Sequence, residues 1–119
     1  MRRLIAAALL LAGLSGTADA ACYVPTWRMV WDTEGIIYMQ MDGGGTCRTS
    51  FSRVWNTSEI HAVSIKSAPR NGSASAGGRG VTYRPRAGFK GEDSFMFLVT
   101  GRKAGAAQRA TMRVNVTVR

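Results

Sequence analysis

The sequence predicts an all-β protein that folds as a single sandwich of about seven strands, after a cleaved N-terminal signal peptide. Apolar and polar side chains alternate with a period of two in many segments after residue 20, whereas helical periodicity is nearly absent. Turn-forming sequences rich in glycine separate these segments. Seven or eight short strands in about one hundred residues are typical of a β-sandwich that fills one domain.

Residues 1–20 have the three-part pattern of a secretory signal peptide. Two arginines follow Met1, residues 4–14 form an uncharged apolar run, and small residues stand at Ala18 and Ala20. We therefore expect cleavage after Ala20 and a secreted or periplasmic domain of residues 21–119, with no transmembrane segment after cleavage.

Residues 1–20 could instead be a transmembrane anchor or the signal of a lipoprotein. A transmembrane anchor would need roughly 20 apolar residues, and the apolar run is much shorter. Lipid attachment at Cys22 is disfavoured by Asp19, which stands where lipoprotein signals usually carry an aliphatic residue.

The chain is strongly basic. Its net charge is +9 at pH 7, and loss of the two leader arginines and Asp19 would leave +8. Such an excess favours contact with polyanions by electrostatic attraction. Because the charges are dispersed among apolar residues, generic basicity is the alternative. The predicted partner is an unidentified protein or an anionic envelope polymer, and no specific binding of nucleic acid is expected.

Two cysteines, Cys22 and Cys47, remain after cleavage. In an oxidising compartment the default expectation is that they pair. The bond would restrict the unfolded chain by about 3–3.5 kcal/mol and would tie the first strand of the mature protein to the third. Two free thiols are the alternative if the Cα atoms lie too far apart.

The two C-terminal strands have the clearest alternation. In the last segment Met112, Val114, Val116 and Val118 fall on one face and polar residues on the other, which predicts a strand with one buried face. In residues 93–100, three apolar side chains share the buried face, and the opposite face is predicted to be partly covered. The other expected strands are Thr26–Trp31, Ile36–Met41, Thr46–Ser52, Ile60–Lys66, Ser73–Ala76 and Gly80–Arg84.

Turn chemistry separates these strands. Glycine adopts positive φ without steric cost and asparagine tolerates it. Turns are therefore expected at Asp42–Gly45, Asn71-Gly72, Ala76–Gly78 and Gly101–Gly105.

A motif of spaced aromatic, proline and glycine residues runs through the C-terminal half. It begins with the turn Pro69–Gly72, and the residues that define it further on are Tyr83, Pro85, Phe89, Gly91, Asp93, Phe95 and Phe97. From Pro69 to Val118 the chain resembles the bacterial immunoglobulin-like and cadherin-like modules of secreted and surface proteins. The resemblance implies an immunoglobulin-like sandwich in a bacterial protein. For this exported module we expect a non-enzymatic binding or structural role in the cell envelope. The alternative is a cationic exported protein that binds polyanions or acts against bacteria.

The motif residues also have a direct physical interpretation. Tyr83 and Phe89 each contribute about 1.5–3 kcal/mol when buried. Pro85 ends a strand by removing a ladder donor, and Gly91 lets the chain bend before the next strand. Asp93 is expected to accept hydrogen bonds from backbone N–H groups at the corner rather than to bind a ligand.

No metal or cofactor is expected. Calcium-binding relatives carry acidic residues around the turn after the aromatic strand, but here that turn contains Arg102 and Lys103. Calcium needs several oxygen ligands, and only six acidic residues follow the leader. Zinc needs more histidine or thiolate ligands than this chain offers.

The sequence predicts no enzymatic activity. His61 is the only histidine, and neither a G-x-S-x-G motif nor a histidine pair occurs. A hydrolase that uses His61 is a remaining alternative, since a triad would need a nucleophile and a carboxylate that converge on it.

Basic residues provide the candidate binding site. Six of them belong to the predicted hairpin of residues 80–100 and its adjoining loops and are expected to form one basic edge: Arg79, Arg84, Arg86, Lys90, Arg102 and Lys103. The tryptophans at 27, 31 and 55 either fill the core or line an apolar patch beside this edge, where they would suit an interaction surface.

Overall fold

The computed structural model describes residues 21–51 and 58–119, and the described chain is built from eight strands with no helix. The predicted signal peptide and Trp55 lie outside the described residues. No helix within the described ranges is long and apolar enough to cross a membrane. The strands are β1 (Ala21–Tyr23), β2 (Glu34–Asp42), β3 (Cys47–Ser50), β4 (Ser58–Ser67), β5 (Gly72–Gly77), β6 (Gly80–Pro85), β7 (Gly91–Lys103) and β8 (Ala106–Val118).

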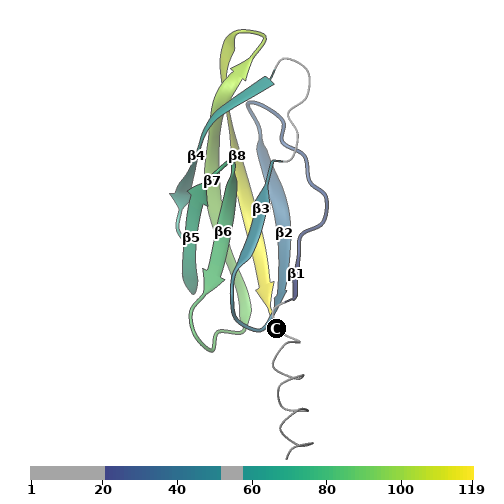
Figure 1. Ribbon diagram of the computed structural model, residues 1–119, viewed down its shortest axis with the longest axis vertical. Coiled ribbons are helices and arrows are strands. Elements are labelled where there is room, and N and C mark those ends of the chain that lie inside the picture. Colours follow the sequence, from purple (N-terminus) through teal and green to yellow (C-terminus); the bar gives the residue numbers. More distant parts are fainter. Residues whose placement is uncertain (1–20, 52–57) are drawn as a thin grey trace, which may run out of the picture.

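The strands form two sheets that pack as an immunoglobulin-like sandwich, which confirms the predicted fold class (Figure 1). The larger sheet has the order β1-β2-β8-β7-β4 and the smaller has the order β3-β6-β5. All pairs are antiparallel except β2 with β8, which run parallel. The large sheet therefore gathers strands from both ends of the chain.

The core lies between the two sheets and consists of the inward-facing residues of each strand. The alternation predicted for β8 is confirmed, because Met112, Val114, Val116 and Val118 are all buried. On β7 the buried face is Phe95, Phe97 and Val99, as expected, and the opposite face is half-buried at Met96 and Leu98.

The prediction of a strand at Thr26–Trp31 is wrong. The segment is extended, and Trp27, Met29 and Trp31 are partly buried against the core. It forms no ladder with a neighbouring strand. A period of two indicates an extended backbone with one covered face. This segment meets that condition through side chains that pack against the core, without pairing to a strand.

The two hairpins turn more tightly than predicted. The turns between β5 and β6 and between β7 and β8 contain two residues each, Gly78-Arg79 and Ala104-Gly105, all four with positive φ. That backbone twist matches the twist of the paired strands. Gly101, expected in a loop, is a buried strand residue. A side chain at this position would collide with the backbone carbonyl oxygen of Glu59, so only glycine fits.

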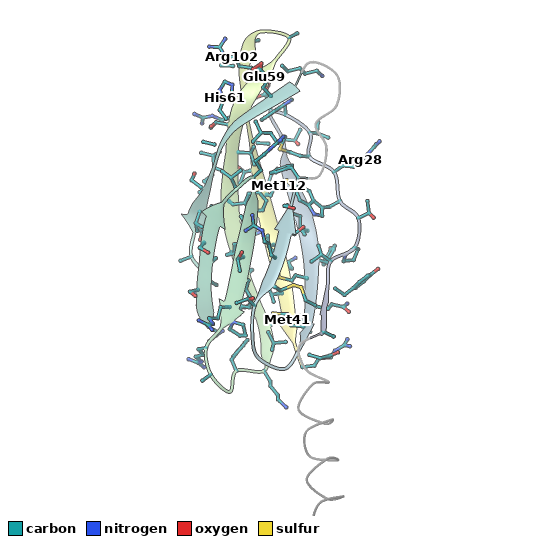
Figure 2. The ribbon with its side chains drawn as sticks, in the orientation of Figure 1. Arg28, Met41, Glu59, His61, Arg102 and Met112 are labelled. Carbon is teal, nitrogen blue, oxygen red and sulfur yellow. A yellow bond between two sulfur atoms is a disulfide. The ribbon has the colours of Figure 1, made fainter. Side chains whose placement is uncertain are left out.

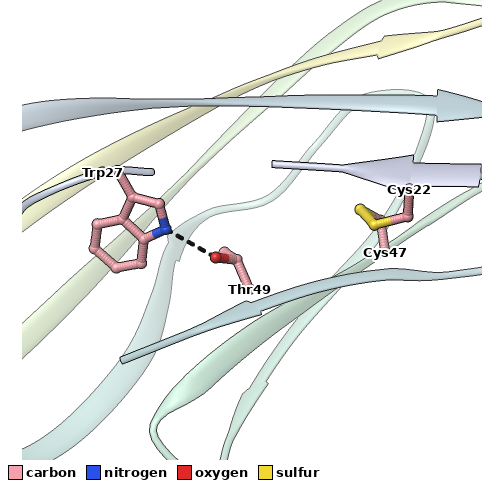
Figure 3. Close-up of a disulfide and its surroundings, with 4 residues drawn as sticks. All are labelled: Cys22, Trp27, Cys47 and Thr49. Carbon is pink, nitrogen blue, oxygen red and sulfur yellow. Dashed lines mark hydrogen bonds between the residues drawn. A yellow bond between two sulfur atoms is a disulfide. The ribbon is translucent and has the colours of Figure 1, made fainter. Parts of the chain in front are cut away.

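The disulfide between Cys22 and Cys47 is confirmed and joins the two sheets (Figure 3). Its Cα atoms are 5.5 Å apart, and it connects β1 of the large sheet to β3 of the small sheet. Beside it, the indole Nε1 of Trp27 donates a hydrogen bond of 2.8 Å to Thr49 Oγ1 on β3. The Trp27 ring also packs edge-on against Phe51, with centroids 5.0 Å apart. Trp27 thus packs at the edge of the core and does not form part of an exposed apolar patch.

Candidate anion-binding site

An open hollow of about 700 Å³ lies at one end of the sandwich. It is formed by the glycine loop between β2 and β3, the corner between β4 and β5, the loop between β6 and β7, and the residue that follows β8. Figure 1 shows these connections at the end of the molecule where β8 finishes, which is opposite to the β7–β8 hairpin. Loops from both sheets therefore surround one site.

Five cationic side chains line this hollow, and we call it the basic hollow: Arg70, Arg84, Arg86, Lys90 and Arg119. Pro85 is buried, so its two neighbours Arg84 and Arg86 are exposed by the alternation of the strand. Arg70 comes from the β4–β5 corner and Arg119 from the end of the chain, so the site combines residues that are far apart in sequence.

Short backbone hydrogen bonds hold the β6–β7 loop in place. The amide of Arg86 donates to the carbonyl of Asn71 at 2.8 Å, and the amide of Phe89 donates to the carbonyl of Arg86 at 3.1 Å. The guanidinium of Arg86 lies 5.6 Å from the centroid of the Phe89 ring. This cation–π contact orients the guanidinium without neutralising its charge.

No carboxylate side chain lines the basic hollow. Among residues 21–51 and 58–119, the only ion pair within 4.0 Å joins His61 to Glu59. In the described part of the chain, none of the five cations therefore forms an ion pair within 4.0 Å. Guanidinium groups present paired N–H donors that match the oxygens of carboxylate and phosphate groups, so the hollow has the chemistry of an anion site.

Asp93 fixes the corner that carries Arg70. Its carboxylate accepts hydrogen bonds from the backbone amides of Arg70, Asn71 and Ser94 at 3.1, 3.0 and 2.9 Å. It also accepts a bond of 2.8 Å from the hydroxyl of Tyr83. Asp93 is thus occupied by structural contacts within the fold and is not a lining residue of the basic hollow.

Tyr83 links this corner to the core. Its side chain is fully buried, and its ring stacks on Phe95 with centroids 5.9 Å apart. Burial raises the pKa of the Tyr83 hydroxyl above its ordinary value, and the hydrogen bond to Asp93 and the negative charge of Asp93 raise it further. The hydroxyl therefore stays protonated and keeps donating to Asp93 at neutral pH.

The remaining motif residues shape the turn into β7. Pro85 and Phe97 are buried in the core, Phe89 is half-buried, and Gly91 has a φ of +133°, a conformation that side chains rarely adopt. These residues form the frame on which the loop from Arg86 to Lys90 is mounted.

The six predicted basic residues do not form one edge. Arg84, Arg86 and Lys90 meet at the basic hollow, whereas Arg102 and Lys103 end β7 about 35 Å away along an extended strand. Arg102 donates to the carbonyl of Gly105 in the hairpin turn. Arg79 sits in the β5–β6 turn. Proximity to one hairpin in sequence does not place residues at the same end of it.

The sequence-based prediction missed Arg70 and Arg119. The only signal for Arg70 was its position in the Pro69–Gly72 turn of the motif. Arg119 continues the outward-facing alternation of β8, but its approach to the hollow depends on β8 pairing with both β2 and β7. The order of strands in the sheet cannot be derived from the residues near Arg119.

His61 lies at the opposite end of the molecule, where Figure 2 shows it with Glu59 and Arg102 near the β7–β8 hairpin. Its Nε2 is 3.5 Å from Glu59 Oε2, and both side chains are at least half exposed. It occupies a bulge of β4 between Ile60 and Ala62. Among the described residues, no group of three or more His, Cys, Asp or Glu side chains is placed to hold a metal ion.

These features define an immunoglobulin-like module with a basic hollow at one end. The sequence model of the family described as "Bacterial Ig domain" matches residues 48–117, and the chain belongs to that family. The resemblance inferred from the motif is thus confirmed. A search of curated proteins found no match.

The family match sets coarse limits on function. Domains of this family are generally non-catalytic, and a bacterial Ig domain with a disulfide is compatible with an extracytoplasmic location. The matched segment begins in β3, so β1, β2 and both cysteines precede it. The disulfide therefore fastens the N-terminal strands to the family core.

Proposed function

We propose that this protein is an exported, non-enzymatic module of the bacterial cell envelope that binds an anionic polymer at the basic hollow. The observation that carries the proposal is the convergence of five cationic side chains on a hollow with no acidic side chain in its lining. An anionic ligand would satisfy charges that have no carboxylate partner among the described residues.

Export is supported by two independent features. Residues 1–20 carry the pattern of a secretory leader, and the Cys22–Cys47 disulfide is of the kind that persists in oxidising compartments. The alternative is a module whose role is structural and whose positive charge is generic.

A polymer site of this kind has a defined salt dependence. Each cation that neutralises an anionic group releases a condensed counterion, so affinity falls with rising salt according to the number of contacts. Arginine contributes further by paired hydrogen bonds to one anionic group. If binding is local, only the cations of the basic hollow set the salt dependence. If it reflects net charge, all exposed cations contribute equally.

The test compares two variants of equal net charge. In the site variant, Arg84, Arg86 and Lys90 are replaced by glutamate. In the control, the exposed residues Arg28, Lys103 and Arg109, none of which lines the hollow, are replaced in the same way. The exported, oxidised protein is applied to immobilised lipopolysaccharide or teichoic acid and eluted with a salt gradient.

We expect the site variant to elute at much lower salt than the wild type and the control to stay close to the wild type. Equal losses in the two variants would show that only net charge matters, which contradicts the proposal. No retention of the wild type beyond that of an equally basic protein would favour the structural role instead.

A further inference from the structure

A second hollow, of about 820 Å³, lies beside the basic hollow on the outer face of the large sheet. We call it the polar hollow. Strand register places its outward side chains in two rows that each cross β2, β8 and β7. The first row is Tyr38, Asn115 and Ser94, and the second is Gln40, Thr117 and Glu92.

The rows form a regular polar platform. Neighbouring strands lie about 4.8 Å apart and successive rows about 6.6 Å apart. Amide and hydroxyl groups both donate and accept hydrogen bonds, and they occur here as Asn115, Gln40, Thr117 and Ser94. The spacing and chemistry match a ligand that carries many hydroxyl groups.

Tyr38 adds an aromatic surface to this platform. Its side chain is 57% exposed although it stands in the middle of a strand. An exposed aromatic ring offers a flat apolar face with a polar edge. The C–H face of a pyranose ring can pack on such a face while its hydroxyl groups reach the neighbouring amides.

The two hollows share one lining residue. Arg70 lines both of them. On β8, Thr117 in the polar hollow is followed two residues later by Arg119 in the basic hollow, so successive side chains of the same sheet face belong to the two sites. The two hollows are therefore neighbours on the surface, within reach of one extended polymer chain.

From these contacts we infer that the ligand is an acidic polysaccharide, which rests its sugar rings on the polar hollow and its anionic groups in the basic hollow. The inference rests on the proposed function and specifies its ligand. Glu92 lies in the polar hollow, so repulsion directs the anionic groups to the basic hollow. A polyphosphate has no rings or hydroxyl groups for the rows at Tyr38 and Gln40.

The test measures binding of the exported, oxidised protein to four labelled probes of matched length. Polygalacturonate carries carboxylates and a phosphomannan carries phosphates, while inorganic polyphosphate and single-stranded DNA are anionic without being polysaccharides. Tyr38→Ala removes the aromatic surface. Ile36→Ala is the matched control, because Ile36 lies two residues away on the same strand, is 50% exposed and does not line the hollow.

We expect at least one acidic polysaccharide to bind more tightly than polyphosphate. Tyr38→Ala should weaken that binding about tenfold, as expected for an aromatic contact at a binding site. It should leave polyphosphate binding and the midpoint of urea unfolding unchanged, and Ile36→Ala should have little effect on any probe.

Two results would overturn the inference while the proposed function stands. The first is equal binding of polyphosphate and both polysaccharides with no effect of Tyr38→Ala. The second is tight binding of single-stranded DNA that alone depends on Tyr38, which would assign the ring to base stacking. Failure of all four probes to bind would instead overturn the proposed function as well.

Discussion

The two long sides of the sandwich are closed by different means. On the side of β1 and β3, the sheets are joined by the Cys22–Cys47 bond and by Trp27, whose indole reaches Thr49. On the side of β4 and β5, the chain itself crosses between the sheets, and the corner is held by hydrogen bonds to Asp93. One closure is covalent and aromatic, and the other is polar.

The difference shows how each closure depends on conditions. A disulfide stabilises mainly by restricting the unfolded chain, and the effect does not depend on protonation. The hydrogen bonds to Asp93 exist only in the folded protein, and the one that Tyr83 donates is sensitive to high pH. The polar closure also carries Arg70, so it connects stability to the basic hollow.

The largest effect is expected on the covalent side. Replacing both Cys22 and Cys47 by serine removes a bond between residues separated by 25 positions. The loop-entropy relation predicts a loss of about 3–3.5 kcal/mol in the free energy of unfolding. Urea unfolding of the double variant and of the reduced wild type should give the same loss. A loss below about 1 kcal/mol would show that Trp27 alone keeps this side closed.

The polar side is expected to be broken by Asp93→Ala. Three backbone amides and the buried hydroxyl of Tyr83 lose their acceptor. A buried group left without a partner costs about 1–3 kcal/mol. That cost applies in full to the Tyr83 hydroxyl, whereas the part-buried amides of Asn71 and Ser94 regain some water and the exposed amide of Arg70 regains it fully. We therefore expect a loss of about 2–3 kcal/mol. The variant should also elute from anionic polymer at lower salt, because the corner with Arg70 is released. Unchanged retention together with lost stability would separate the corner from the site.

The sequence was informative about these two sides to different degrees. The pairing of the cysteines and the role of Asp93 as an acceptor for backbone amides follow from residue chemistry and the motif. The structure contains the disulfide and the hydrogen bonds from backbone amides to Asp93. Alternation in Thr26–Trp31 predicts a strand, but the segment packs against the core without pairing, and the sequence pattern is the same in both cases. The prediction of a single basic edge is wrong because the sequence pattern does not show which residues lie at the same end of a sheet. The 13 residues of β7 separate its ends, and only the topology assigns Arg70 and Arg119 to the same end.

A third experiment uses pH to weaken the hydrogen bond between Tyr83 and Asp93 on the polar side. The pKa of Tyr83 is raised in the folded protein, first by burial and then by Asp93, whereas an unfolded tyrosine ionises near pH 10. The native state therefore holds its proton more tightly than the unfolded state. This stabilisation is complete below about pH 10 and is lost as the pH rises further.

Tyr83→Phe is the variant that isolates this effect. It removes the hydroxyl that donates to Asp93 but keeps the ring that stacks on Phe95. Because a hydrogen bond to a charged group contributes about 1.5–3 kcal/mol, we expect a loss near the lower limit at neutral pH, since Asp93 keeps its three amide donors. Above pH 10 the wild type should lose stability more steeply than the variant. Parallel pH profiles would mean that other groups govern alkaline unfolding.

The smallest effect is expected for Trp27→Phe, which sharpens the comparison within the covalent side. The change removes the Nε1 bond to Thr49 but leaves an aromatic ring facing Phe51 and Phe97. A neutral hydrogen bond contributes about 1 kcal/mol, so the loss should be of that size. Measured in both the oxidised protein and the variant without cysteines, the two losses form a double-mutant cycle. Equal losses would show that the disulfide and the indole close this side independently. A larger loss without the disulfide would show that each compensates for the other, because either one then suffices to hold β3 against the N-terminal segment.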